Sequence, residues 1–310
     1  MNEKYTPPEE KKPSILDSME NQIALANKLG NVYENRPDID KFKGAMAGTK
    51  FESEYTEEAI NKNKLYVEQT RAKIEESNSN FGKERLEHLE GGFQLSEILQ
   101  AMIVDRLNKH WFKDCQAIMT SDFDDLCGID AVIKHEKGGY LGIALDFTVT
   151  NQDKKIYEKV KKNWTQNTEE GKIPTVKYFE DPDTKEKGRL LVPKFIIGGS
   201  KKDVEELSSA YLTNNTEVLE NHPFKYMMLL QIEEQLQTVL DYYEAHSGEP
   251  KIQFAKKQYE RIQTILRNMK NEIHSDEKMH ENTDLYEYSK SSVALDMMRR
   301  FRIMREKDSK

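Results

Sequence analysis

The segment from Phe93 to Leu212 constrains the fold most, because one buried-helix pattern is followed there by several strand patterns. Apolar residues occupy most of the circumference of the helix expected over 93–110, which is typical of a helix inside a core. The remaining elements expected in order are strands at 115–120, 128–136 and 140–150, a helix at 151–164, strands at 175–179 and 189–197, and a helix at 200–212. This order predicts an α/β fold with a central mixed sheet of about five strands.

The flanks of this core are polar, and their patterns are helical. Helices are expected over 15–29, ending at Gly30, and from Thr56 to Ser77. Prolines and dense charges make residues 1–13 unable to form a packed segment. We therefore expect a disordered tail at 1–13, a helical N-terminal region at 14–92, the α/β core at 93–212 and a helical C-terminal region at 213–310.

The C-terminal region repeats apolar residues four and three positions apart. From Ala255 to Ile273 this spacing predicts the seam of a helical hairpin or short coiled coil, which suggests a protein partner or self-association through these helices. A last helix, expected over 285–305, ends in a basic stretch. That stretch and the lysines at 154–162 are candidates for phosphate contacts, with an ordinary solvated face as the alternative.

Charge and hydropathy limit the classes of partner. The formal net charge is −8, so contact with a polyanion must come from local basic patches. No run of about 18 apolar residues occurs, so we expect no membrane span and a cytoplasmic protein. The two cysteines, Cys115 and Cys127, are expected to be reduced.

Two aspartates, Asp130 and Asp146, each interrupt an apolar strand pattern. Alternate residues of a strand share a face, so Asp146 and Thr148 belong together. If the strands pair through the Gly138-Gly139 turn, with residue numbers that sum to about 277, Asp130 comes beside Asp146 within one residue of register. Two close carboxylates need a proton, a cationic partner or a metal, and Mg²⁺ suits an oxygen-only site. The alternative is that both aspartates lie at strand ends or edges in water.

The order of elements, with Asp on the second strand and an acidic residue on the third, resembles the PD-(D/E)XK phosphodiesterase superfamily over 93–212. The run from Asp124 to Asp130 resembles the lead into the first aspartate. The resemblance implies an αβββαβ restriction-endonuclease-like core in which Asp130 and Asp146 bind Mg²⁺ or Mn²⁺, with Glu97 as a third acidic contact. It also implies a metal-dependent nuclease that hydrolyses phosphodiester bonds of nucleic acid, with DNA expected before RNA.

The third-strand motif departs from the acidic-x-Lys of that family, because this chain has Asp146-Phe147-Thr148. Some members are similar in taking the basic group from the following helix, which would assign it to Lys155 or Lys159. Thr148 would then stand in the place of the usual lysine and position water. The alternative is a catalytically inactive nuclease-like scaffold that binds partners through its helical arms.

Overall fold

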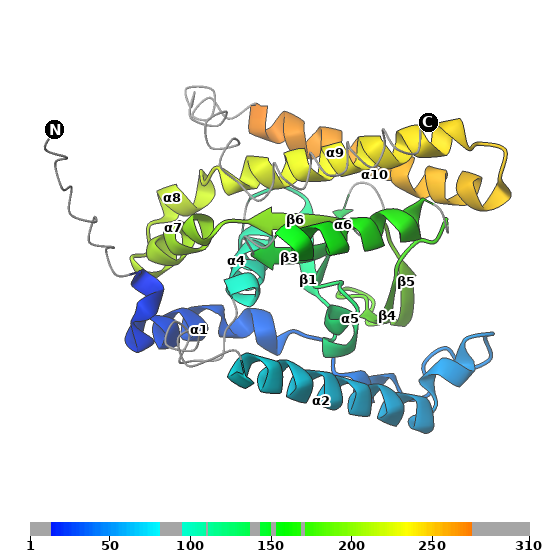
Figure 1. Cartoon of the computed structure of the whole chain (residues 1–310), viewed down its shortest axis with the longest axis horizontal. Coiled ribbons are helices and arrows are strands. Elements are labelled where there is room, and N and C mark those ends of the chain that lie inside the picture. Colours follow the sequence, from blue (N-terminus) through cyan, green and yellow to red (C-terminus); the bar gives the residue numbers. More distant parts are fainter. Residues whose placement is uncertain are drawn as a thin grey trace, which may run out of the picture.

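The computed structural model describes residues 14–80, 95–109, 111–136, 143–149, 153–168 and 171–274. Only the backbone is described at 17, 75, 77–80, 143–149, 153–156 and 273–274. The fold is mixed α/β, as expected (Figure 1). The tail at 1–13 and the basic helix expected over 285–305 lie outside the described residues. Within the described ranges, no helix combines the length and the apolar character needed to cross a membrane.

The central sheet has four strands in the order β1 (Cys115–Met119), β2 (Ala131–His135), β3 (Ile143–Val149) and β6 (Lys194–Gly199). The pairs β1–β2 and β2–β3 are antiparallel, whereas β3–β6 is parallel. The sheet is therefore mixed, and the parallel pair requires the long crossover that the chain makes between 149 and 194.

The expected sheet of about five strands is corrected to four strands and a separate hairpin of β4 (Thr175–Glu180) and β5 (Lys187–Leu191). Sequence periodicity predicts one strand over 189–197, but the chain divides at Val192-Pro193 into β5 and β6. Proline has no N–H for a ladder hydrogen bond and favours a strand boundary. The apolar run over 189–197 is therefore divided between β5 of the hairpin and β6 of the central sheet.

Helices cover the sheet. The buried helix expected from the sequence is α4 (Leu95–Asn108), which packs on β1 and β3. The crossover helix α6 (Asp153–Asn167) contacts β6 and runs in front of the sheet in Figure 1. Short helix α5 (Asp122–Leu126), which the sequence patterns did not predict, joins β1 to β2.

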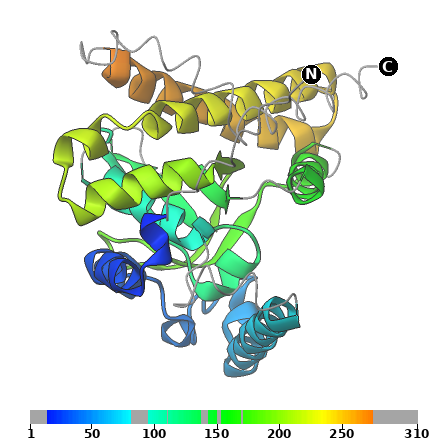
Figure 2. The same cartoon turned by 60° about the vertical axis from the view of Figure 1, so that its left-hand side comes forward.

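After β6 the chain forms α7 (Lys201–Leu212), α8 (Thr216–Glu220), α9 (Phe224–Ala245) and α10 (Pro250–His274). Figure 2 shows α9 and α10 side by side as an antiparallel hairpin, as the seam predicts. The described seam side chains are buried inside the chain, from Ala255 to Met269. The seam is therefore part of this protein's own core and is not a surface for a partner.

Helix α9 also covers the open edge of the sheet. The side-chain amide of Gln235 donates to the carbonyl of Ile196 at 2.8 Å and accepts from its N–H at 2.9 Å. Gln231 makes the same pair of bonds with Gly198, at 3.1 and 2.7 Å. Unpaired strand edges are a site of aggregation, and two buried glutamines satisfy this one.

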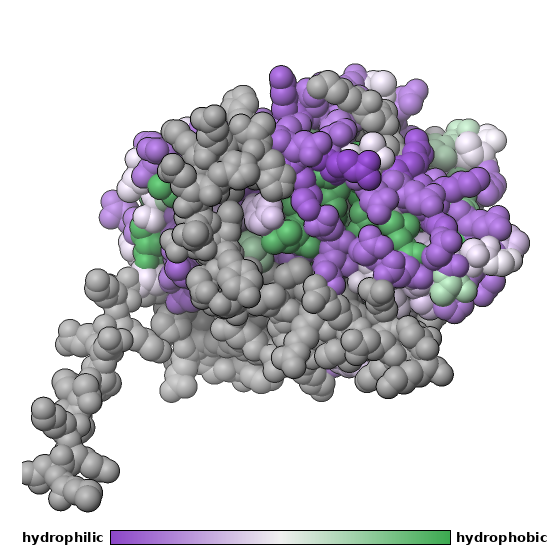
Figure 3. All heavy atoms as spheres, turned by 90° about the horizontal axis from the view of Figure 1, so that it is seen from above, coloured by the Kyte–Doolittle hydropathy of each residue, from purple (hydrophilic) through white to green (hydrophobic). Residues whose placement is uncertain are grey.

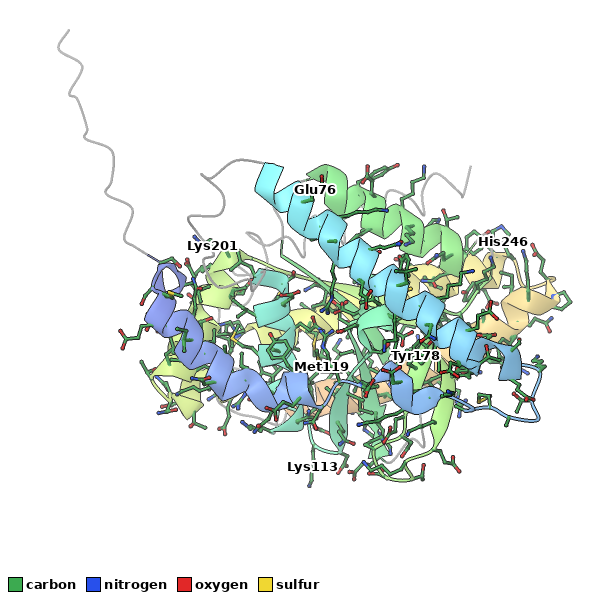
Figure 4. The ribbon with its side chains drawn as sticks, turned by 90° about the horizontal axis from the view of Figure 1, so that it is seen from below. Glu76, Lys113, Met119, Tyr178, Lys201 and His246 are labelled. Carbon is green, nitrogen blue, oxygen red and sulfur yellow. The ribbon has the colours of Figure 1, made fainter. Side chains whose placement is uncertain are left out.

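The N-terminal region packs on the β4–β5 hairpin through the 3₁₀ turns Ile39–Phe42 and Glu52–Tyr55 and through α2 (Glu57–Asn80). Figure 4 shows Tyr178 of β4 beside α2, and the amide of Asn63 donates to its hydroxyl at 2.7 Å. Helix α1 (Met19–Glu34) continues through Gly30, where a stop was expected, because Leu29 and Val32 on both sides of the glycine are buried.

Gly199, the last residue of β6, lies where no side chain fits. A Cβ there would be 2.5 Å from Cδ2 of Leu99 and 3.2 Å from Cε2 of Phe224. We expect Gly199→Ala to lower the free energy of unfolding by about 1–3 kcal/mol, because α4 or α9 must move. Urea unfolding measures this. The control is Gly30→Ala, whose Cβ meets nothing within 4 Å and should stabilise α1 by about 0.5–1 kcal/mol. Equal losses in both variants would contradict the packing argument.

Candidate functional site

The register of β2 and β3 sets the relative positions of the two candidate aspartates. Ala131 pairs with Leu145 and Val132 with Ala144. The paired residues end there, and extending the same register by one residue would set Asp130 opposite Asp146. Residues directly opposite on antiparallel strands belong to the same face of a sheet. The expected pairing differs from the observed one by a single residue, and the observed one brings the two positions closer.

The backbone of Asp130 is held from two sides. Its carbonyl accepts a hydrogen bond from the N–H of Thr120 at 3.1 Å, which extends the β1–β2 ladder, and another from the side chain of Gln100 at 3.2 Å. Gly128, with φ of 85°, turns the chain from α5 into this position. Asp130 is 7% exposed. A carboxylate at such a buried position requires compensating charge or hydrogen bonds, and a bound cation is one way to supply the charge.

Glu97 lies one helical turn before Gln100 on α4, so the helix that touches Asp130 also carries the third candidate acid. Glu97 is half-buried, and its carbonyl accepts from the Tyr33 hydroxyl at 3.0 Å. Burial, followed by the negative charge of Glu97, raises the pKa of Tyr33. Helix α1 thus packs against the end of α4 that carries Glu97.

The acidic residues of α5 have structural partners. Asp124, 1% exposed, accepts from the N–H groups of Lys177 and Tyr178 at 2.6 and 3.0 Å and from the Ser121 hydroxyl at 2.7 Å. Asp122 and Asp125 both bind Arg36, at 2.9 and 2.7 Å. The acidic run before Asp130 therefore joins α5 to β4 and to the N-terminal region.

Clusters of three or more His, Cys, Asp or Glu side chains suited to a metal do not occur among the described side chains. That set does not include Asp146, whose backbone alone is described. A site built on Asp130 and Asp146 therefore involves a side chain outside the described set. Its donor set would consist of carboxylate oxygens, which suits a hard divalent cation.

The basic candidates of α6 and Thr148 are less closely defined. Lys155 is described by its backbone, and Lys159 is half-buried on α6. Thr148 stands two residues after Asp146 on β3, opposite Gly198 of β6. Alternation along the strand assigns it to the face of Asp146, as expected.

Lys194 is a basic residue that the sequence patterns did not single out. It begins β6, pairs with Ala144 of β3 and is 5% exposed. Register and alternation assign Lys194 to the same face as Asp146 and Asp130. One signal was present in the sequence, since Lys194 is the single charged residue of an apolar run from Leu190 to Gly199.

Lysines from three elements surround Cys127, in the loop that leads from α5 to Asp130. Both cysteines are free, as expected. Burial raises the pKa of the Cys127 thiol, the charge of Asp124 raises it further, and Lys162, Lys194 and Lys177 oppose this increase. These lysines come from α6, β6 and β4 respectively. These three lysines are therefore close enough to act electrostatically on the loop that precedes Asp130.

Comparison of the chain with protein-family models, with curated proteins and with solved structures gives no match.

Proposed function

We propose that this protein is a metal-dependent nuclease of the PD-(D/E)XK type, with Asp130 and Asp146 as ligands of Mg²⁺ or Mn²⁺. The observation that carries this function is the β2–β3 register, whose extension by one residue beyond the pair Ala131–Leu145 would set Asp130 opposite Asp146. Further support comes from the order α4, β1, β2, β3, α6, β6 with β3 and β6 parallel, which resembles the αβββαβ core. Mg²⁺ held there would polarise a scissile phosphate and activate a water molecule.

The surrounding residues have definite roles in this function. Glu97 is the third acidic contact, because α4 already meets Asp130 through Gln100. Thr148 positions the attacking water, and Lys155 or Lys159 of α6 contacts the phosphate. The substrate is nucleic acid, with DNA before RNA, and the lysines near Cys127 supply the local positive charge that a polyanion requires.

A metal titration tests this function. Mn²⁺ should raise the melting temperature of the wild type, because a ligand that binds only the folded state stabilises it by about 2.7 kcal/mol at 100 times its Kd. Asp146→Ala should lose the response. The control Asp183→Ala removes an exposed carboxylate, with 69% of its side chain accessible, and should respond like the wild type. A wild type that ignores Mn²⁺, or a normal response in Asp146→Ala, would reject the metal site.

The second candidate function is an inactive nuclease-like scaffold, and the Asp146-Phe147-Thr148 motif without lysine favours it. Its partner surface cannot be the α9–α10 seam, which is buried. Figure 3, seen from the side of these helices, shows mainly hydrophilic side chains with smaller apolar areas between them. The outer side of α2, where Leu65 and Tyr66 are about half exposed, is the surface that a scaffold would offer.

A further inference from the structure

A buried lysine shares the sheet face that carries both aspartates. Lys194 is 5% exposed at the start of β6, whereas Lys162 on α6 is exposed. Burying an ammonium group is unfavourable without a nearby negative charge. Two carboxylates on one face repel each other, and a nearby positive charge reduces this repulsion. The sheet register therefore places complementary charges on the same face.

The spacing suits a direct interaction with the site. Lys194 pairs with Ala144, two residues before Asp146 on the neighbouring strand. With strands about 4.8 Å apart and a rise of about 3.3 Å per residue, such diagonal neighbours are about 8 Å apart, within reach of a long side chain. A lysine has a four-carbon stem and a compact charge at its tip. Its ammonium group can thus reach the region between the strands that a bound phosphate would occupy.

The backbone of β6 is held firmly at this point. The side-chain amide of Asn163 on α6 donates to the carbonyl of Lys194 at 3.3 Å. Two residues later, Gln235 of α9 makes both of its bonds to Ile196. Helices α6 and α9 therefore fix the backbone from which the Lys194 side chain extends. A functional group that must be positioned precisely requires such support.

We propose that Lys194 supplies the basic group that is missing from the third-strand motif, and that it stabilises the negative charge developing on the scissile phosphate. This role rests on the proposed nuclease function. It replaces Lys155 and Lys159 as the first candidate, because the strand register positions Lys194 relative to Asp146 directly. The basic group comes from the parallel strand β6 instead of from β3 or α6.

Mn²⁺-dependent nicking of supercoiled plasmid by purified full-length variants tests this role. Lys194→Met should lower kcat at least about a hundredfold, the usual contribution of one positioned acid–base or charged group. Lys194→Arg keeps the charge and should retain more activity than Lys194→Met. The control Lys251→Met removes an exposed lysine of α10, with 51% of its side chain accessible, and should stay within about threefold of the wild type. Circular dichroism checks the fold, and Lys194→Gln replaces Lys194→Met if the latter does not fold.

Mn²⁺ binding separates a role in chemistry from a structural one. Lys194→Met removes a positive charge that repels Mn²⁺ and competes with it for the two carboxylates. The variant should therefore bind Mn²⁺ as tightly as the wild type or more tightly while it loses cleavage. Wild-type cleavage by Lys194→Met, or equal losses in Lys194→Met and Lys194→Arg with weakened Mn²⁺ binding, would overturn the role of Lys194 alone. A folded wild type that neither binds Mn²⁺ nor cleaves would overturn the nuclease function and this role with it.

Discussion

Asp130→Asn is expected to reduce Mn²⁺-dependent cleavage of plasmid about a thousandfold or more while the protein remains folded. Asparagine has nearly the shape of aspartate but lacks the negative charge that holds a divalent cation. A metal contributes several kcal/mol to stabilising charge in the transition state, and about 4 kcal/mol corresponds to a thousandfold in rate. The described hydrogen bonds to Asp130 involve its backbone carbonyl, so Thr120 and Gln100 can still hold the strand.

The measurement compares wild type, Asp130→Asn and Asp183→Asn on plasmid, single-stranded DNA and RNA. Asp183 is exposed in the β4–β5 turn, so its variant should cleave at the wild-type rate. Retention of cleavage in Asp130→Asn would show that another site is responsible. Loss of cleavage in both variants would show that the assay reports stability or charge instead of metal binding.

Asp124→Ala is expected to lower the free energy of unfolding by about 3–5 kcal/mol, the largest stability effect that we predict. The carboxylate is 1% exposed and accepts from two backbone N–H groups of β4 and from the Ser121 hydroxyl. Alanine would leave these buried donors without an acceptor, and each buried unsatisfied donor costs about 1–3 kcal/mol. The loss should separate α5 from the β4–β5 hairpin.

Urea unfolding followed by circular dichroism measures this effect, with Asp122→Ala as the control. Asp122 is on the same short helix, but 42% of its side chain is exposed, and Arg36 keeps its bond to Asp125. Exposed ion pairs contribute about 0–1 kcal/mol, so the control should lose little. Similar losses in the two variants would mean that the buried hydrogen bonds of Asp124 are not the source of the effect.

Local patterns predicted those features of the fold that depend on neighbours in sequence. The helix over 93–110 and the α9–α10 hairpin follow from the spacing of apolar residues, and both are observed. The helix expected over 200–212 is observed as α7, and a capping box of Ser200 and Asp203 starts it. Helix periodicity and caps operate over three or four residues, so they can be recognised without knowledge of the fold.

Long-range features could not be predicted in the same way. Strand patterns show that a segment is extended, but they do not show which segments pair. The division of 189–197 between two sheets depends on where the hairpin and the crossover pack, and the pairing of Lys194 with Ala144 joins residues fifty positions apart. Gly30 is a local signal for the end of a helix. Helix α1 nevertheless continues to Glu34, because its next turn buries Val32 as the preceding turn buries Leu29.

The sequence alone determined that two aspartates lie in neighbouring apolar strands, because a short turn limits their possible registers. Only the tertiary structure decided the register of β2 on β3, the contact of Gln100 on α4 with the backbone of Asp130, and the pairing of Lys194 on β6 with Ala144 on β3. These pairings and contacts form when segments distant in the sequence pack together and bury apolar surface. The free energy that stabilises them comes from the whole core, so no local pattern reveals them.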